Sequence, residues 1–139
     1  MPHISFSRED FDAFRANDRP GPIHMLNLVT LREMADYDDG TQATGAEAYA
    51  TYGRLTAQIL ARVGGRLIWR GQMEQMLIGP ADVAWDLCFI VEYPEAAAFL
   101  NMLKDPEYQA AVPHRQAAVL DSRLIRMAPL SVGNGFGGS

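Results

Sequence analysis

Hydrophobic residues occupy both alternating sets of positions between Trp85 and Tyr93, where the chain reads WDLCFIVEY. This run is rich in β-branched and aromatic side chains, which pack well on a pleated surface. Because apolar residues fall on both sides of the run, it predicts a central strand that is packed on both faces. The run from Ile23 to Val29 shows equally little alternation and predicts a second central strand. Pro94 cannot donate to a sheet ladder and therefore ends the first of these strands.

Two sequences of the capping-box type predict where helices begin. Ser7-Arg-Glu-Asp10 precedes a short helix that carries two phenylalanines on one face. Thr44-Gly-Ala-Glu47 precedes a longer segment in which apolar residues recur at helical spacing. We expect that helix to end at Val63, because Gly64-Gly65 supplies glycine at the carboxyl-terminal cap.

Proline residues divide the segment that follows the Trp85–Tyr93 strand. Asp105-Pro106 is expected to break the first helix of this segment and to open another turn. Pro113 is expected to separate that turn from the residues beyond it. Asp121-Ser122 then turns the chain into a last strand, which we expect over Arg123–Met127.

The predicted order of elements is a helix followed by β-α-β-β-α-β. Residues 66–73 supply the second strand, which residues 74–79 continue as a bulged or edge segment. The simplest arrangement is an α+β, ferredoxin-like fold with a four-stranded antiparallel sheet and two helices on one face. We divide the chain into a helical extension over residues 1–20, a ferredoxin-like domain over 21–130 and a flexible, glycine-rich tail over 131–139.

The second face of this sheet predicts a partner. Met25, Trp69, Phe89 and their neighbours supply more apolar strand surface than two helices can cover. An uncovered apolar face marks a partner site or a ligand cavity. We therefore expect a homodimer in which two sheets pack face to face.

Composition limits the class of protein. The chain has 139 residues, of which 48% are hydrophobic, and a formal net charge of −5. One domain of this size can bury a substantial core. The sequence has no stripe of basic residues, so we expect no nucleic-acid partner. No apolar run reaches the roughly 20 residues that are needed to cross a membrane. A single cysteine and the lack of a signal-peptide pattern lead us to expect a cytoplasmic protein.

Short motifs along the chain give a resemblance to a known family. They are Met25-Leu-Asn-Leu28, Tyr49-x-x-Tyr52, Gly64-Gly65, Trp85-Asp86, Tyr93-Pro94, Asp105-Pro-Glu-Tyr-Gln109 and His114-Arg115. In their order and spacing over about residues 22–129, the chain resembles the family called domain of unknown function 1330. The resemblance implies a dimeric α+β barrel, related in fold to small monooxygenases and to the EthD and NIPSNAP groups. It implies no substrate, because no reaction is settled for the family.

Tyr108, His114 and Arg115 form the polar cluster that best suggests a catalytic site. Tyr108 and Arg115 are seven residues apart and share a face if the helix is unbroken. An arginine and a tyrosine beside a sheet can hold an anion or an enolate. The structural alternative, which we favour slightly, is that Arg115 pairs with a carboxylate at Asp105 or Glu107.

His24 and Asn27 lie within the first apolar strand. Histidine titrates near neutral pH and could move a proton, although a core histidine bonded to the backbone is the commoner case. A buried amide must be hydrogen-bonded, so Asn27 either orients a ligand carbonyl or ties down a loop.

Four further residues complete the candidate ligand site, namely Tyr49, Tyr52, Trp69 and Arg70. The two tyrosines are three residues apart on the inner face of a helix, where their hydroxyl groups could reach a cavity. Arg70 could join Asn27 and Asp86 in a cleft, or form an ion pair at the sheet edge.

These residues support two functional hypotheses. The first is a small enzyme of the monooxygenase or isomerase kind, which acts without metal or flavin on a small hydrophobic carbonyl or phenolic compound. The second is a non-catalytic module that binds a small molecule or a protein partner. The sequence contains no zinc pattern, calcium loop or dinucleotide fingerprint, so we expect no metal site and no cofactor.

Overall fold

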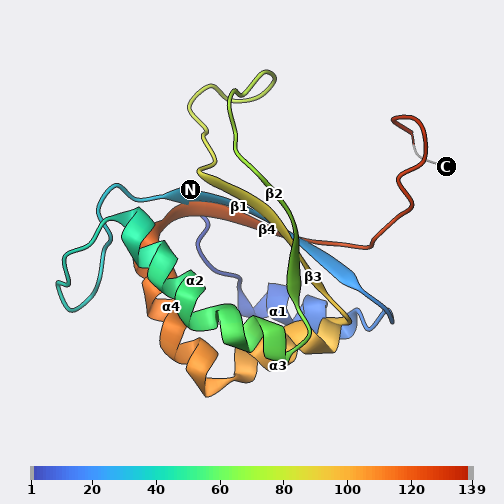
Figure 1. Cartoon of the computed structure of the whole chain (residues 1–139), viewed down its shortest axis with the longest axis horizontal. Coiled ribbons are helices and arrows are strands. Elements are labelled where there is room, and N and C mark those ends of the chain that lie inside the picture. Colours follow the sequence, from blue (N-terminus) through green and yellow to red (C-terminus); the bar gives the residue numbers. More distant parts are fainter. Residues whose placement is uncertain (1, 138–139) are drawn as a thin grey trace.

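The computed structural model describes residues 2–137 and shows a single four-stranded sheet with helices on one side. The elements in chain order are α1 (Arg8–Ala16), β1 (Ile23–Leu31), α2 (Gly45–Arg62), β2 (Arg66–Gly71), β3 (Leu87–Tyr93), α3 (Ala96–Lys104), α4 (Pro106–Ala118) and β4 (Val119–Met127). All paired strands are antiparallel, in the order β2-β3-β1-β4. This arrangement confirms the predicted ferredoxin-like fold, with α1 as an addition at its amino-terminal end (Figure 1).

The two strands predicted to be central occupy the middle of the sheet. β1 pairs with β3 on one side and with β4 on the other. The pairing of β1 with β3 runs from Ile23↔Tyr93 to Val29↔Leu87. Their inward side chains form a core with the helices, whose main members are Ile23, Met25, Ile59, Val91, Tyr93, Phe99 and Met102. Each such side chain stabilises the fold by roughly 1.5–3 kcal/mol when fully buried.

The predicted helix caps are present. Thr44 accepts a hydrogen bond from the backbone N–H of Glu47 at 3.0 Å, and the Glu47 carboxylate accepts one from the Thr44 N–H at 2.8 Å. Ser7 accepts a bond from the Asp10 N–H at 3.0 Å and thereby starts α1. After α2, Gly64 adopts a φ of 82°, which a glycine reaches without steric cost.

The prediction for the residues around Pro113 is wrong. α4 runs without a break from Pro106 to Ala118 and includes Pro113. A proline inside a helix removes one backbone hydrogen bond. α4 retains its helical form because it packs along α2 and buries a series of small and aromatic side chains, namely Tyr108, Ala111, Ala117 and Ala118.

Two predicted strand boundaries also differ. β4 begins at Val119, directly after α4, and a register irregularity opposite Thr30 and Leu31 replaces the expected turn at Asp121-Ser122. Residues 74–79 do not extend β2. The pairing of β2 with β3 ends at Gly71↔Cys88, so the residues beyond have no strand opposite them.

The sheet face that points away from the helices is apolar across its middle and carries the contact of Glu92 with His24 and Arg66 at one end, and we call it the open face. Strand register places the following residues on it: His24, Leu26, Leu28, Trp69, Ile90, Ile125 and Met127. Trp69 is 49% exposed and Ile125 is 42% exposed. Met25 and Phe89, which we grouped with Trp69 in the sequence, instead face the helices. α1 also lies on the helix side, where Phe14 packs on Phe99, and so it leaves the open face uncovered (Figure 1).

Candidate functional site

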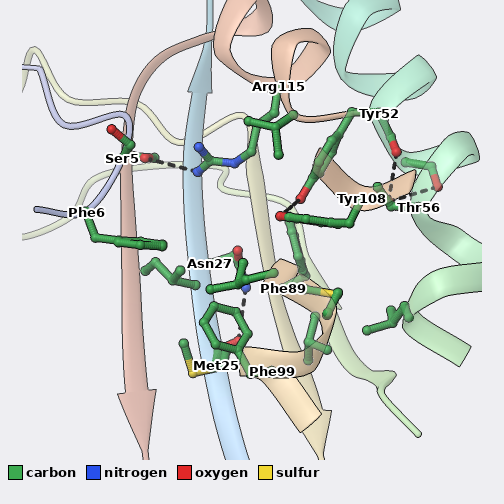
Figure 2. A pocket seen from close by; sticks show the side chains of 18 of the residues that line it. Ser5, Phe6, Met25, Asn27, Tyr52, Thr56, Phe89, Phe99, Tyr108 and Arg115 are labelled. Atoms are coloured by element: carbon green, nitrogen blue, oxygen red, sulfur yellow. Dashed lines mark hydrogen bonds between the residues drawn. The ribbon is translucent and has the colours of Figure 1, made fainter. Parts of the chain in front are cut away.

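A cavity of about 1010 Å³ lies between the sheet and the helices. Its walls are the inward face of the sheet and the facing sides of α2 and α4, and the segment from His3 to Phe14 borders it. Apolar side chains dominate this lining, among them Met25, Phe89 and Phe99 (Figure 2). A largely apolar cavity with a few convergent polar groups is the usual form of a small-molecule site.

Three tyrosines, which we call the tyrosine cluster, supply polar groups to this cavity: Tyr49, Tyr52 and Tyr108. The hydroxyl oxygens of Tyr52 and Tyr108 are 2.8 Å apart and share a hydrogen bond, as Figure 2 shows. The Tyr49 and Tyr52 rings lie 5.4 Å apart on α2, while Tyr108 comes from α4. Helical spacing on α2 and the packing of α2 on α4 therefore bring the cluster together.

Two members of the tyrosine cluster, Tyr49 and Tyr52, have raised pKa values. Burial raises the pKa of Tyr52 well above its usual value, and the neighbouring Tyr108 raises it further. Burial also raises the pKa of Tyr49, although the charge of Arg115 acts in the opposite direction. Both phenols are therefore neutral at physiological pH and can donate hydrogen bonds, but neither can serve there as a base.

Arg115 connects the cavity with the amino-terminal segment. One of its terminal nitrogens donates to the carbonyl oxygen of Ile4 at 2.6 Å, and the other lies 3.4 Å from the Ser122 hydroxyl oxygen. Ser122 in turn donates to the carbonyl oxygen of His3 at 2.7 Å. Figure 2 shows the Arg115 side chain reaching from its helix toward this segment.

The preferred sequence interpretation of Arg115, as the partner of a carboxylate on its own helix, is wrong. Asp105 and Glu107 instead lie 3.6 and 3.5 Å from a terminal nitrogen of Arg62, which reaches them from α2. Arg62 stands in the last turn of α2, next to the start of α4, whereas Arg115 faces the sheet.

Asn27 and Arg70 also line the cavity. The Asn27 amide nitrogen donates to the carbonyl oxygen of Met25 at 3.1 Å, which fixes the side chain on the inward face of β1. Arg70 pairs in register with Phe89, and it borders a second, smaller hollow that also includes Asp86. Asp86 itself accepts a bond from the Leu31 N–H at 2.7 Å, so its carboxylate is engaged with the backbone rather than with Arg70.

The structure places three predicted site residues away from the cavity. His24 and Trp69 lie on the open face, with His24 bonded to Glu92 at 2.9 Å. His114 lies 2.7 Å from the Tyr37 hydroxyl and does not line the cavity. The predicted cluster of Tyr108, His114 and Arg115 is therefore divided, and the cavity contains only Tyr108 and Arg115.

The contact between Glu92 and His24 predicts a pH dependence of stability. The hydrogen bond from His24 and then that from Arg66 hold the pKa of Glu92 below its usual value. A carboxyl whose pKa is lowered by folding stabilises the protein above its unfolded pKa, and this contribution is lost as the pH falls through the folded pKa. We expect Glu92→Gln to weaken the loss of stability on acidification, in urea titrations between about pH 7 and about pH 3 at fixed protein concentration.

Glu74→Gln is the control for this measurement, since Glu74 is exposed in the loop between β2 and β3. It should leave the acid dependence of the wild-type chain unchanged. If Glu92→Gln and the wild-type chain lose stability in parallel as the pH falls, the contact of Glu92 with His24 does not contribute to the acid dependence of stability.

Sequence reasoning missed Ser122 and the amino-terminal carbonyl groups. Ser122 was assigned to a turn, and nothing in the residues around His3 and Ile4 marks them as partners of a position more than a hundred residues away. Contacts of this kind depend on the tertiary fold rather than on a local pattern.

Residues 2–137 contain no group of three or more His, Cys, Asp or Glu side chains placed to hold a metal ion. No helix in that part of the chain is long and apolar enough to cross a membrane.

A family profile described as domain of unknown function (DUF1330) matches residues 40–127, which is more than half of the chain. The chain belongs to this family. The match confirms the resemblance carried by the short motifs, and it begins after α1 and β1. No curated protein matches this DUF1330 chain.

Solved structures agree with this assignment. The RPA0582 protein of unknown function from Rhodopseudomonas palustris is 59% identical, with 94% of this DUF1330 chain and 99% of that chain covered and a TM-score of 0.92. A methylated form of RPA0582 gives a TM-score of 0.94.

Two more distant structures show similarity of fold alone. A dimeric ferredoxin-like protein of unknown function from Bacteroides fragilis is 14% identical, covering 77% of this chain and 95% of its own, with a TM-score of 0.50. SnoaB, a cofactor-independent oxygenase from Streptomyces nogalater, is 15% identical, covering 80% and 95%, also with a TM-score of 0.50.

Proposed function

We propose that this DUF1330 protein binds a small, largely apolar compound in the cavity and stabilises the anionic form of a carbonyl or phenolic oxygen on it. The observation that carries the proposal is the pair of hydroxyl groups of Tyr52 and Tyr108, 2.8 Å apart beside an apolar cavity. Phenol hydroxyl groups and a nearby guanidinium are donors suited to an enolate or phenolate oxygen.

The polar groups have complementary roles in this proposal. Within the hydrogen-bonded pair of Tyr52 and Tyr108 one hydroxyl donates to the other, and the remaining O–H donates to the ligand oxygen. The positive charge of Arg115 favours negative charge on that oxygen. Asn27 borders the same space and orients the ligand. SnoaB, which shares the fold, is a cofactor-independent oxygenase, so the fold is compatible with an activity that needs no cofactor.

A second candidate function is binding without catalysis. The acid–base properties of the tyrosine cluster favour it, because the raised pKa values of Tyr49 and Tyr52 leave neither of them as a base at neutral pH. Catalysis would therefore require a ligand that is acidic enough to lose its proton to solvent. Incubation of the protein with a naphthol or a β-diketone in air separates the two functions, because an enzyme converts the compound to a product and a binding module leaves it unchanged.

The binding site is tested by removing one hydroxyl group. Tyr52→Phe should weaken the binding of naphthol about tenfold, because a net hydrogen bond contributes about 1 kcal/mol and the desolvated partner adds to the loss. Isothermal titration calorimetry measures the change in Kd. Tyr37→Phe is the matched control, since Tyr37 also loses a hydrogen-bonded hydroxyl but lies outside the cavity. Equal Kd values for both variants would refute the site.

We also propose that the protein acts as a homodimer through the open face, with the cytoplasm as its location. Apolar side chains cross the open face in one register row, namely Trp69, Ile90, Leu26 and Ile125. An apolar surface that crosses a whole sheet is typical of a partner site. The dimeric ferredoxin-like protein of Bacteroides fragilis supports this assembly.

A further inference from the structure

The lining of the cavity is cationic, although the chain as a whole is acidic. The chain has 12 Lys and Arg residues against 17 Asp and Glu residues. The charged residues that border the cavity are four arginines and one aspartate: Arg70, Arg115, Arg123, Arg126 and Asp10. Arg123 pairs in register with Leu28 and points to the open face, so the inward arginines are Arg70, Arg115 and Arg126. The acidic excess of the chain is thus reversed at this one site.

Most of this positive charge has no carboxylate partner. Arg123 pairs with Asp121 at 3.0 Å. Within residues 2–137, no carboxylate oxygen lies within 4.0 Å of a side-chain nitrogen of Arg70, Arg115 or Arg126. The Asp10 carboxylate accepts a bond from Ser7 at 3.0 Å, at the start of α1. An apolar cavity with uncompensated arginines favours an anionic ligand.

Arg115 and Ser122 present the best-formed part of this cationic lining. Their acceptors are two neutral carbonyl oxygens of consecutive residues, those of Ile4 and His3, at 2.6 and 2.7 Å. A guanidinium forms stronger, shorter bonds with a carboxylate than with a neutral carbonyl, and its planar fork fits both carboxylate oxygens. A carboxylate in the place of these amino-terminal carbonyls would therefore form the stronger bond with Arg115.

The remainder of the cavity suits an apolar body attached to that head group. Met25, Phe89 and Phe99 line the cavity around Asn27, as Figure 2 shows. Removing an aromatic or alkyl group from water into this space contributes about 25 cal/mol per Å². The two requirements together define an amphipathic ligand that carries a negatively charged head group.

We propose that the cavity takes a hydrophobic carboxylic acid as its anion, with the carboxylate on Arg115 and Ser122 in the place of the His3 and Ile4 carbonyls. The proposal rests on the cavity being the functional site and specifies the class of compound that it binds.

Matched acids and amides test the charge requirement, because they share shape and apolar area. Calorimetry on the full chain at neutral pH should give a Kd for naphthylacetate at least about tenfold lower than that for naphthylacetamide, a difference of about 1.4 kcal/mol. Arg115→Gln should bring the ratio of the two Kd values close to one. Arg62→Gln, which removes an arginine outside the cavity, should leave the ratio unchanged.

The outcomes separate this inference from the broader function. Equal binding of acid and amide overturns the carboxylate site, while naphthol binding that depends on Tyr52 would still support the cavity as the functional site. If acid, amide and naphthol all fail to bind, both proposals are overturned.

Hydrogen exchange tests the position of the carboxylate. The His3 N–H donates to the Asp121 carboxylate at 2.7 Å, which protects it from exchange. Its exchange should become faster when naphthylacetate binds and should not change with naphthylacetamide, because only the acid displaces the two carbonyl groups. Unchanged exchange with bound acid would place its carboxylate elsewhere and overturn the inference.

Discussion

Ile125→Glu should convert the protein from a dimer into a monomer at micromolar concentration. Ile125 lies on the open face, 42% exposed in the single chain, in the register row that includes Leu26 and Ile90. In a monomer this position tolerates a glutamate, because water reaches the carboxylate. Between two apolar sheets, the same carboxylate would lose its hydration without gaining a partner, at a cost of several kcal/mol per subunit.

Sedimentation equilibrium measures this change directly, and Leu55→Glu is its matched control. Leu55 is 43% exposed, almost the same as Ile125, but it lies on α2 rather than on the sheet. A stable dimer buries about 800 Å² per partner, which a sheet face can supply. We expect the wild-type chain and Leu55→Glu to be dimers. A monomeric wild-type chain would contradict the assembly, and dissociation of Leu55→Glu alone would place the interface on the helices.

Local patterns were sufficient to predict the fold. The apolar runs around Ile23 and Phe89 carry enough hydrophobic surface for both sheet faces, which is why they indicated central strands. The capping box at Thr44 and the glycines at Gly64-Gly65 determine the ends of α2 through local geometry. Such features depend on neighbouring residues only, so they can be read before any tertiary contact is known.

Only some of the predicted site residues line the cavity. The alternation of side chains in strands explains why several of the others do not. Neighbouring strand residues point to opposite faces. Trp69 and Arg70 therefore could not both line one cavity within a regular strand, and neither could His24 and Asn27, which are an odd number of positions apart. The sequence does not say which member of each pair faces the helices, because both faces are apolar.

Helical geometry places the side chains of His114 and Arg115 on different sides of α4. His114 and Arg115 are consecutive on α4, so they differ in direction by about 100°. Arg115 faces the sheet, whereas His114 points to Tyr37 in the loop before α2. Tyr108 and Arg115 do share the cavity, as their seven-residue spacing predicted, because α4 continues through Pro113.

Gly45→Ala should be strongly destabilising, although alanine is the better helix former. Gly45 is the first residue of α2 and is buried against the end of β1. A Cβ atom there would lie 1.8 Å from the carbonyl oxygen of Arg32, which is backbone and cannot rotate away. Either β1 or the start of α2 would have to move, and we expect a loss of about 3 kcal/mol in the free energy of unfolding.

Gly53→Ala is the control for this prediction, because it makes the same substitution within the same helix. Apart from its chain neighbours and the backbone of its own helix, no atom lies within 4 Å of a Cβ placed at Gly53, so the substitution acts through helix propensity. The free energy of unfolding should rise by about 0.5–1 kcal/mol. Urea denaturation at one protein concentration compares the two variants, and opposite signs are expected. A stable Gly45→Ala protein would show that the close approach of Arg32 to α2 relaxes freely, and that the loop from residue 32 to 44 does not hold α2 against the sheet.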